Sequence, residues 1–74
     1  MGLGPGESHL LATVMQSPFF KDGEKPDLYA AILKADRRGA ERISDLPLWV
    51  QDAVDRHIYL MRIAGHLPPG WKRP

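Results

Sequence analysis

The chain has 74 residues, 43% of them hydrophobic, and its ten Lys and Arg against nine Asp and Glu side chains give a formal net charge of +1. A domain of this size buries only about 60% of the surface that its unfolded chain exposes, so it needs efficient helix packing, oligomerisation or a partner for stability. The absence of cysteine excludes disulfides and cysteine-based metal sites, and the balanced charge gives no overall positive field for nucleic-acid binding.

The first ten residues show no basic stretch followed by a long apolar run, so they do not resemble a signal peptide. No apolar stretch approaches the roughly 20 residues that span a bilayer. Gly6 occupies the position at which N-myristoylation requires Ser or Thr. We therefore expect a cytoplasmic protein without a membrane anchor.

The glycine-rich residues 1–6 predict a flexible N-terminal arm, and a first helix is predicted over about residues 7–16. Glu7 suits the first turn because a negative charge there interacts favourably with the helix dipole. Pro18 ends the helix because the residue before a proline is disfavoured in the helical conformation. The apolar face of this helix consists of Leu10, Leu11, Val14 and Met15.

A second helix is predicted over about residues 26–38. Pro26 is suited to the first helical position, where its missing N–H would have no partner in any case. Two arginines fall in the last turn, where cations are favoured, and Gly39 is the expected C-terminal cap.

A third helix is predicted over about residues 46–64, with Ser44 or Asp45 as its N-cap and Pro47 in its first turn. Gly65 should end it, and residues 65–74 form an extended, proline-rich tail. The chain is thus expected to be a single all-α domain, either a three-helix bundle or an orthogonal helical array.

The third predicted helix has an apolar arc wider than the ~100° of an ordinary surface helix. Trp49, Leu60 and Ile63 extend this arc on one side. In one interpretation the rest of the chain covers them and the helix is the centre of a monomer. In the other, these three side chains stay accessible to a second subunit or to another protein.

The sequence HLPPGWKRP near the C-terminus permits two arrangements of Trp71. The tail can fold back so that Trp71 shields the third helix. It can also project Trp71, Lys72 and Arg73 as a docking segment, because Trp and Arg are enriched at binding hot spots. Folding back is the favoured prediction, since an isolated exposed tryptophan lowers solubility.

Catalytic, cofactor and metal motifs are not expected. His57 and His66 lack the i, i+4 spacing of a helical metal pair, and His57 on the apolar stripe is typical of a hydrogen-bonded core histidine. Ser8 and His9 are sequence neighbours with no orienting acid. Glu7 stands where a phosphate-binding loop needs lysine. The sequence therefore indicates a protein that is not an enzyme.

The densest group of basic side chains comprises Lys34, Arg37, Arg38 and Arg42. It allows an alternative function as a small nucleic-acid-binding regulator. The following segment, LPLWVQDAV, is apolar and acidic, however, where a DNA-reading helix needs polar or basic residues. Nucleic acid is therefore the less favoured partner.

The main expectation is a protein-binding module whose partner is another protein or a second copy in a homodimer. Its size and lack of catalytic motifs are typical of accessory factors, inhibitors and assembly chaperones, including phage-encoded ones. The residues predicted to bind the partner are Trp49, Leu60, Ile63, Trp71, Lys72 and Arg73.

Overall fold

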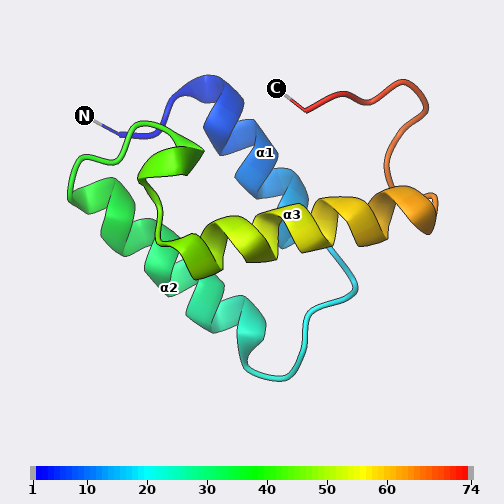
Figure 1. Cartoon of the computed structure of the whole chain (residues 1–74), viewed down its shortest axis with the longest axis horizontal. Coiled ribbons are helices and arrows are strands. Elements are labelled where there is room, and N and C mark those ends of the chain that lie inside the picture. The colour runs from blue at the N-terminus through cyan, green and yellow to red at the C-terminus, as the bar shows by residue number, and fades with distance from the viewer. Residues whose placement is uncertain (1, 74) are drawn as a thin grey trace.

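A computed structural model describes residues 2–73 and confirms the predicted all-α fold (Figure 1). The helices are α1 (Pro5–Met15), α2 (Glu24–Arg37) and α3 (Leu48–Ile63), and a 3-10 turn, η1 (Ile43–Asp45), precedes α3. No strand occurs among the described residues. Helix α3 crosses both α1 and α2 and contacts each of them. Met1 and Pro74, which the predicted arm and tail include, lie outside the described residues.

One core is shared by the three helices and the segment that links α2 to α3. Helix α3 contributes the most buried side chains, because its apolar arc faces both of the other helices. The segment before α3 adds Ala40 and Leu46. The buried residues of the helices that make up this hydrophobic cluster are Leu10, Leu11, Val14, Leu28, Ile32, Val50, Ala53, Val54 and Ile58.

The N-terminal segment differs from the predicted flexible arm. Helix α1 begins at Pro5, two residues before the predicted start, because proline is accommodated in the first turn of a helix. The Leu3 N–H donates to Oδ1 of Asp36 at 2.9 Å, and the Gly4 N–H donates to the Glu41 carbonyl at 3.3 Å. The segment before α1 is therefore attached to the C-terminal end of α2.

Helix α2 ends where the sequence predicts and begins earlier than expected. Gly39 has a φ of 92°, and the Ala40 N–H donates to the Ala35 carbonyl at 3.0 Å. These two features make a glycine-dependent Schellman cap. At the other end Gly23, with a φ of 79°, is the N-cap, so Pro26 lies within the first turn and not at its start.

Helix α3 begins at Leu48, so the prediction of a start at residue 46 with Ser44 or Asp45 as N-cap is wrong. Leu46 precedes Pro47 and is extended, with φ −83° and ψ 156°, as a residue before proline prefers. The Asp45 carboxylate instead accepts the N–H groups of Glu41 and Arg42, both at 3.1 Å. These hydrogen bonds lower the pKa of Asp45.

The C-terminal tail folds back toward α1 after Gly65, as favoured from the sequence (Figure 1). Leu67 and Trp71 are half-buried and pack against the core. Arg73 Nη1 lies 2.7 Å from Asp55 Oδ1 of α3, which ties the end of the tail to that helix. Between residues 2 and 73, no helix has the length and apolar character needed to cross a membrane.

Candidate functional site

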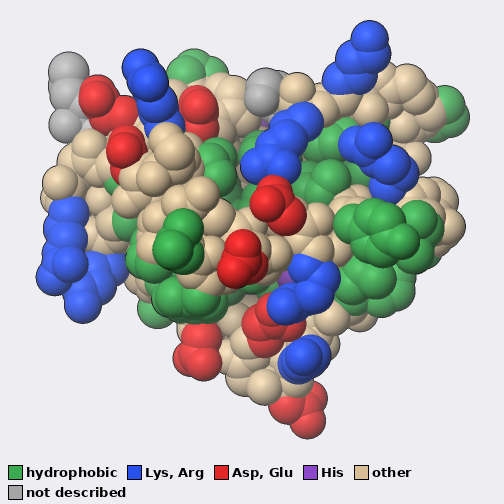
Figure 2. Space-filling view, viewed as in Figure 1, with side chains coloured by type: hydrophobic (Ala, Val, Ile, Leu, Met, Phe, Trp, Pro, Cys, Tyr) green, Lys and Arg blue, Asp and Glu red, His purple; other side chains and the backbone are tan. Residues whose placement is uncertain are grey.

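The three apolar residues predicted as one contact surface on α3 lie in two separate places. Trp49 is 50% exposed at the start of the helix, and Ile63 is 64% exposed at its end, about 21 Å away along the axis. Leu60 is half-buried near Ile63. Figure 2 shows hydrophobic areas over both ends of α3, with acidic and basic side chains between them. We call the two places the Trp49 surface and the Ile63 surface.

The Ile63 surface consists of Tyr59, Leu60 and Ile63 on the last turns of α3. Tyr59 and Ile63 are both exposed. Immediately beyond the helix, His66 packs its ring edge-on against Phe19, with the ring centroids 5.6 Å apart. Ile63 lines neither the two grooves beside Trp49 nor the groove under the tail.

The Trp49 surface is different because its tryptophan lies between two grooves. The first groove runs along the C-terminal half of α2 and contains Lys34, Arg38 and Asp45, whose carboxylate accepts two backbone N–H groups; we call it the basic groove. The second runs along the N-terminal half of α2 and contains Asp22, Asp27, Glu24, Lys21, Asp52 and Arg56; we call it the acidic groove. Trp49 lines both.

The acidic groove is lined by four carboxylates and by two cationic side chains, Lys21 and Arg56. Glu24 is the one acid in it that forms an ion pair within residues 2–73, with Arg56, and it also faces Nε2 of His57. Asp22, Asp27 and Asp52 make no ion pair there. The groove therefore presents three unpaired negative charges beside Trp49.

The basic residues of the alternative prediction gather at the end of α2, where Figure 2 shows a cluster of Lys and Arg side chains. Lys34 and Arg38 line the basic groove with Trp49, whereas Arg37 and Arg42 are exposed and outside its lining. The structure thus brings Trp49 together with two of the four predicted cations. No local sequence pattern indicates this arrangement, because the packing of α3 on α2 creates the groove.

The predicted tail residues do not join the Trp49 surface. Trp71 lines a groove with His9 of α1 and Met61 of α3. Lys72 is exposed, and Arg73 is paired with Asp55. A tail that is held this way covers its own chain and does not project Trp71.

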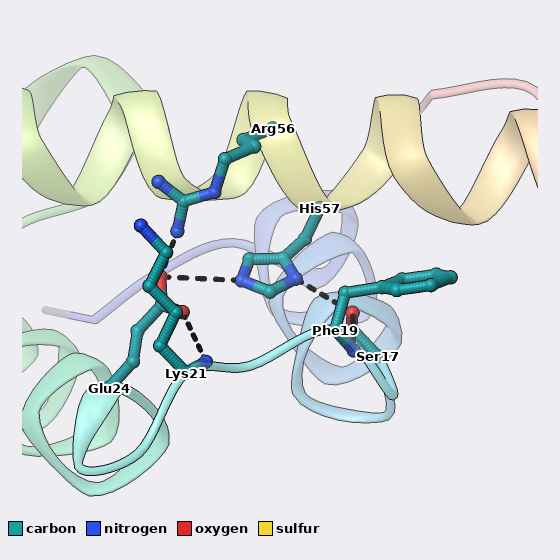
Figure 3. A network of polar contacts seen from close by, with 6 residues as sticks. All are labelled: Ser17, Phe19, Lys21, Glu24, Arg56 and His57. Atoms are coloured by element: carbon teal, nitrogen blue, oxygen red, sulfur yellow. Dashed lines mark hydrogen bonds and ion pairs between the residues drawn. The ribbon is translucent and has the colours of Figure 1, made fainter.

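Apart from these surfaces, the molecule contains a polar group with the composition of a catalytic triad: Ser17, Glu24 and His57 (Figure 3). Ser17 Oγ lies 2.7 Å from His57 Nδ1, and Glu24 Oε2 lies 3.4 Å from His57 Nε2. The segment between α1 and α2 supplies Ser17, the first turn of α2 supplies Glu24, and α3 supplies His57.

The hydrogen bonds of this group fit a structural role. Ser17 Oγ accepts the Phe19 N–H at 3.1 Å, so its hydroxyl hydrogen is available to donate to His57 Nδ1. Nε2 then carries the ring proton and faces the Glu24 carboxylate. Every buried side-chain polar atom described has a partner. His57 is 0% exposed and Ser17 is 6% exposed, so neither can reach a substrate in this conformation.

Glu24 is the hub of this network. Burial acts to raise its pKa, but the Lys21 N–H, the hydrogen bond from His57 and the charge of Arg56 outweigh that effect and lower the pKa overall. The carboxylate is therefore held ionised, with one oxygen accepting the Lys21 N–H at 2.9 Å and the other facing Arg56 and His57.

The sequence predicted His57 as a hydrogen-bonded core histidine, but it could not supply Ser17 and Glu24 as partners. They come from two other segments, and no local spacing links them to α3. For metals, no cluster of three or more His, Asp or Glu side chains is arranged for binding within residues 2–73.

Comparisons of the chain with models of known protein families, with curated proteins and with solved structures give no match.

Proposed function

We propose that the chain is a protein-binding module without enzymatic activity, and that it binds its partner at the Trp49 surface. The observation that carries the proposal is a half-exposed tryptophan between two grooves of opposite charge. Trp, Tyr and Arg are the residue types enriched at binding hot spots, and the Trp49 surface combines Trp49 with Arg38 in one groove. An accessory factor, inhibitor or assembly chaperone of the cytoplasm would act through such a surface.

The grooves support this choice over the Ile63 surface. Both ends of α3 expose two large apolar side chains, Leu48 (76%) and Trp49 (50%) at the start, Tyr59 (62%) and Ile63 (64%) at the end, but only Trp49 lines grooves. Burying side chains of this size against a partner contributes about 1.5–3 kcal/mol each. The grooves add shape and charge around them, which gives the specificity that a bare apolar patch lacks.

The absence of enzymatic activity is part of the proposal, and its support is the burial of the Ser17–His57–Glu24 group. A nucleophile must approach its substrate within about 3–3.5 Å, and Ser17 is buried within the link between α1 and α2. The same three residues serve to fix that link against α3.

The test uses the purified chain as bait and compares Trp49→Ala with Ile63→Ala, the matched truncation at the other end of α3. We expect Trp49→Ala to lose a partner protein, which is then purified and shown to bind the wild-type chain directly in titration calorimetry. Ile63→Ala should bind it within about threefold of the wild type. Loss in the Ile63 variant alone, or equal binding by both variants, would contradict the proposal. Circular dichroism of both variants checks that each is folded.

The alternative function, a small nucleic-acid-binding regulator, is favoured by one observation: Lys34 and Arg38 lie beside an aromatic ring on which a base could stack. It predicts binding to single-stranded DNA that weakens steeply with salt and is reduced by Arg38→Ala. The unpaired carboxylates of the neighbouring acidic groove would repel a phosphate backbone, so protein binding is the better-supported function.

A further inference from the structure

We infer that the partner at the Trp49 surface is a second copy of this chain, with the two α2 helices packed antiparallel about a twofold axis that passes between Ala30 and Ala31. The inference rests on the proposed function and names its partner. Its basis is the charge pattern of α2 together with the two grooves that flank Trp49.

The charges of α2 are complementary to themselves when the helix direction is reversed. Asp27 and Lys34 are equally far from the midpoint between Ala30 and Ala31. A twofold axis at this midpoint exchanges the two ends of the helix. It therefore places Asp27 of each copy opposite Lys34 of the other, which forms two equivalent ion pairs.

These residues are accessible on the face concerned. With about 100° per residue, Asp27, Ala30, Ala31 and Lys34 share one side of the helix. Asp27, Ala30 and Lys34 are exposed, and Ala31 is half-buried. Asp27 and Lys34 are about 10 Å apart along the axis, too far to pair with each other, and neither forms an ion pair within residues 2–73.

The two grooves between α2 and the start of α3 show the same charge complementarity as α2 itself. Rotation about the axis brings the basic groove of one copy, with Lys34 and Arg38, over the acidic groove of the other, with Asp22 and Asp27. Lys34 and Arg38 repel each other mildly at their i, i+4 spacing, and opposing carboxylates would remove that cost. A surface with both charges arranged this way matches itself better than it matches a uniformly acidic or basic protein.

The middle of α2 allows the two helices to approach closely. Ala30 and Ala31 present only methyl groups, and the distance between packed helices is set by the side chains at their contact, so small residues give the short end of the 8–10 Å range. Trp49 lies beside this point in both grooves and supplies the apolar area that two alanines cannot. In the proposed dimer each Trp49 is near the twofold axis.

The test is a pair of charge reversals, Asp27→Lys and Lys34→Asp, followed by sedimentation equilibrium. The wild-type chain should sediment as a dimer of the 8.3 kDa chain at about 100 micromolar and dissociate on dilution. Each variant alone places like charges opposite one another, so its dissociation constant should rise about tenfold or more.

The decisive sample is an equimolar mixture of the two variants. Each new lysine then faces a new aspartate, and the unchanged Lys34 of one chain faces the unchanged Asp27 of the other. We expect this mixture to dimerise about as strongly as the wild type. Lys25→Glu is the control, because Lys25 lies on the other side of α2, where it lines a groove with Met15 and Tyr29; it should leave dimerisation unchanged.

A wild-type chain that stays monomeric up to about 1 millimolar overturns the inference. So does a mixture of variants that dimerises no better than either variant alone. A wild-type monomer whose Trp49→Ala variant loses a different, purified partner would leave the proposed function intact while removing the second copy as its partner.

Discussion

His57 shows how one buried side chain joins three segments of this chain. Its ring is 0% exposed and packs against the Phe20 ring, with the centroids 4.1 Å apart. Both ring nitrogens have partners, Ser17 on one side and Glu24 on the other. A buried polar group with its partners in place stabilises one arrangement of its neighbours, because any other arrangement leaves it without them.

We expect His57→Ala to lower the free energy of unfolding by about 2–4 kcal/mol, since it opens a cavity and removes a partner from both Ser17 and Glu24. His57→Phe fills the site with a somewhat larger aromatic ring and removes both hydrogen bonds, so it opens no cavity and its loss should be smaller but clear. Urea unfolding followed by circular dichroism measures both.

His9→Ala is the control, because His9 is exposed and its side chain has no hydrogen-bond partner among the described residues. It should change stability by less than about 0.5 kcal/mol. If His57→Phe were as stable as the wild type, the hydrogen bonds to Ser17 and Glu24 would contribute nothing to the fold.

At the scale of the elements, helix ends were easier to predict than helix starts. Gly39 and Gly65 end α2 and α3 because each adopts a positive φ, 92° and 76°, which other residues avoid. All three starts differ from the prediction. Pro47 marks the start of α3, and it also favours the extended backbone conformation at Leu46. The buried Leu46 side chain therefore reaches the core from the segment before the helix.

The cap at Gly39 can be tested by substitution. Gly39→Ala should reduce stability by about 1 kcal/mol, because a side chain is strained at this φ although nothing lies within 4 Å of its Cβ position. Gly39→Asn should lose less, since asparagine tolerates the left-handed region. The melting temperatures of the two variants give the comparison, and equal melting of Gly39→Ala and the wild type would contradict the cap's role.

At the scale of the whole molecule, the tail and the N-terminal segment complete a core that three short helices leave partly open. The tail covers α1 and α3 with Leu67 and Trp71, and the segment before α1 is fixed to α2 through Asp36. Trp49 is left uncovered on the remaining side. The two tryptophans therefore have opposite roles, one within the fold and one on its surface.

Two single-tryptophan variants distinguish these roles. In Trp49→Phe the remaining Trp71 should fluoresce at shorter wavelength and resist quenching by iodide. In Trp71→Phe the remaining Trp49 should emit at longer wavelength and be quenched more strongly, at a concentration low enough to keep the chain monomeric. The reverse order of quenching would mean that the tail projects from the fold.

The sequence by itself determined the fold class, the three helices and the glycines that end two of them. These features depend on local backbone preferences and on the spacing of apolar residues, and both can be recognised from residues that are close together in the sequence. The same local information predicted that His57 is buried, because it lies on the apolar stripe of α3.

Only the tertiary structure decided which residues meet. It separated Trp49 from Ile63, placed Trp49 beside Lys34 and Arg38, and supplied Ser17 and Glu24 to His57. Such contacts depend on the crossing of α3 over α1 and α2, and helix crossing is set by packing between faces that the spacing of residues within one helix does not describe.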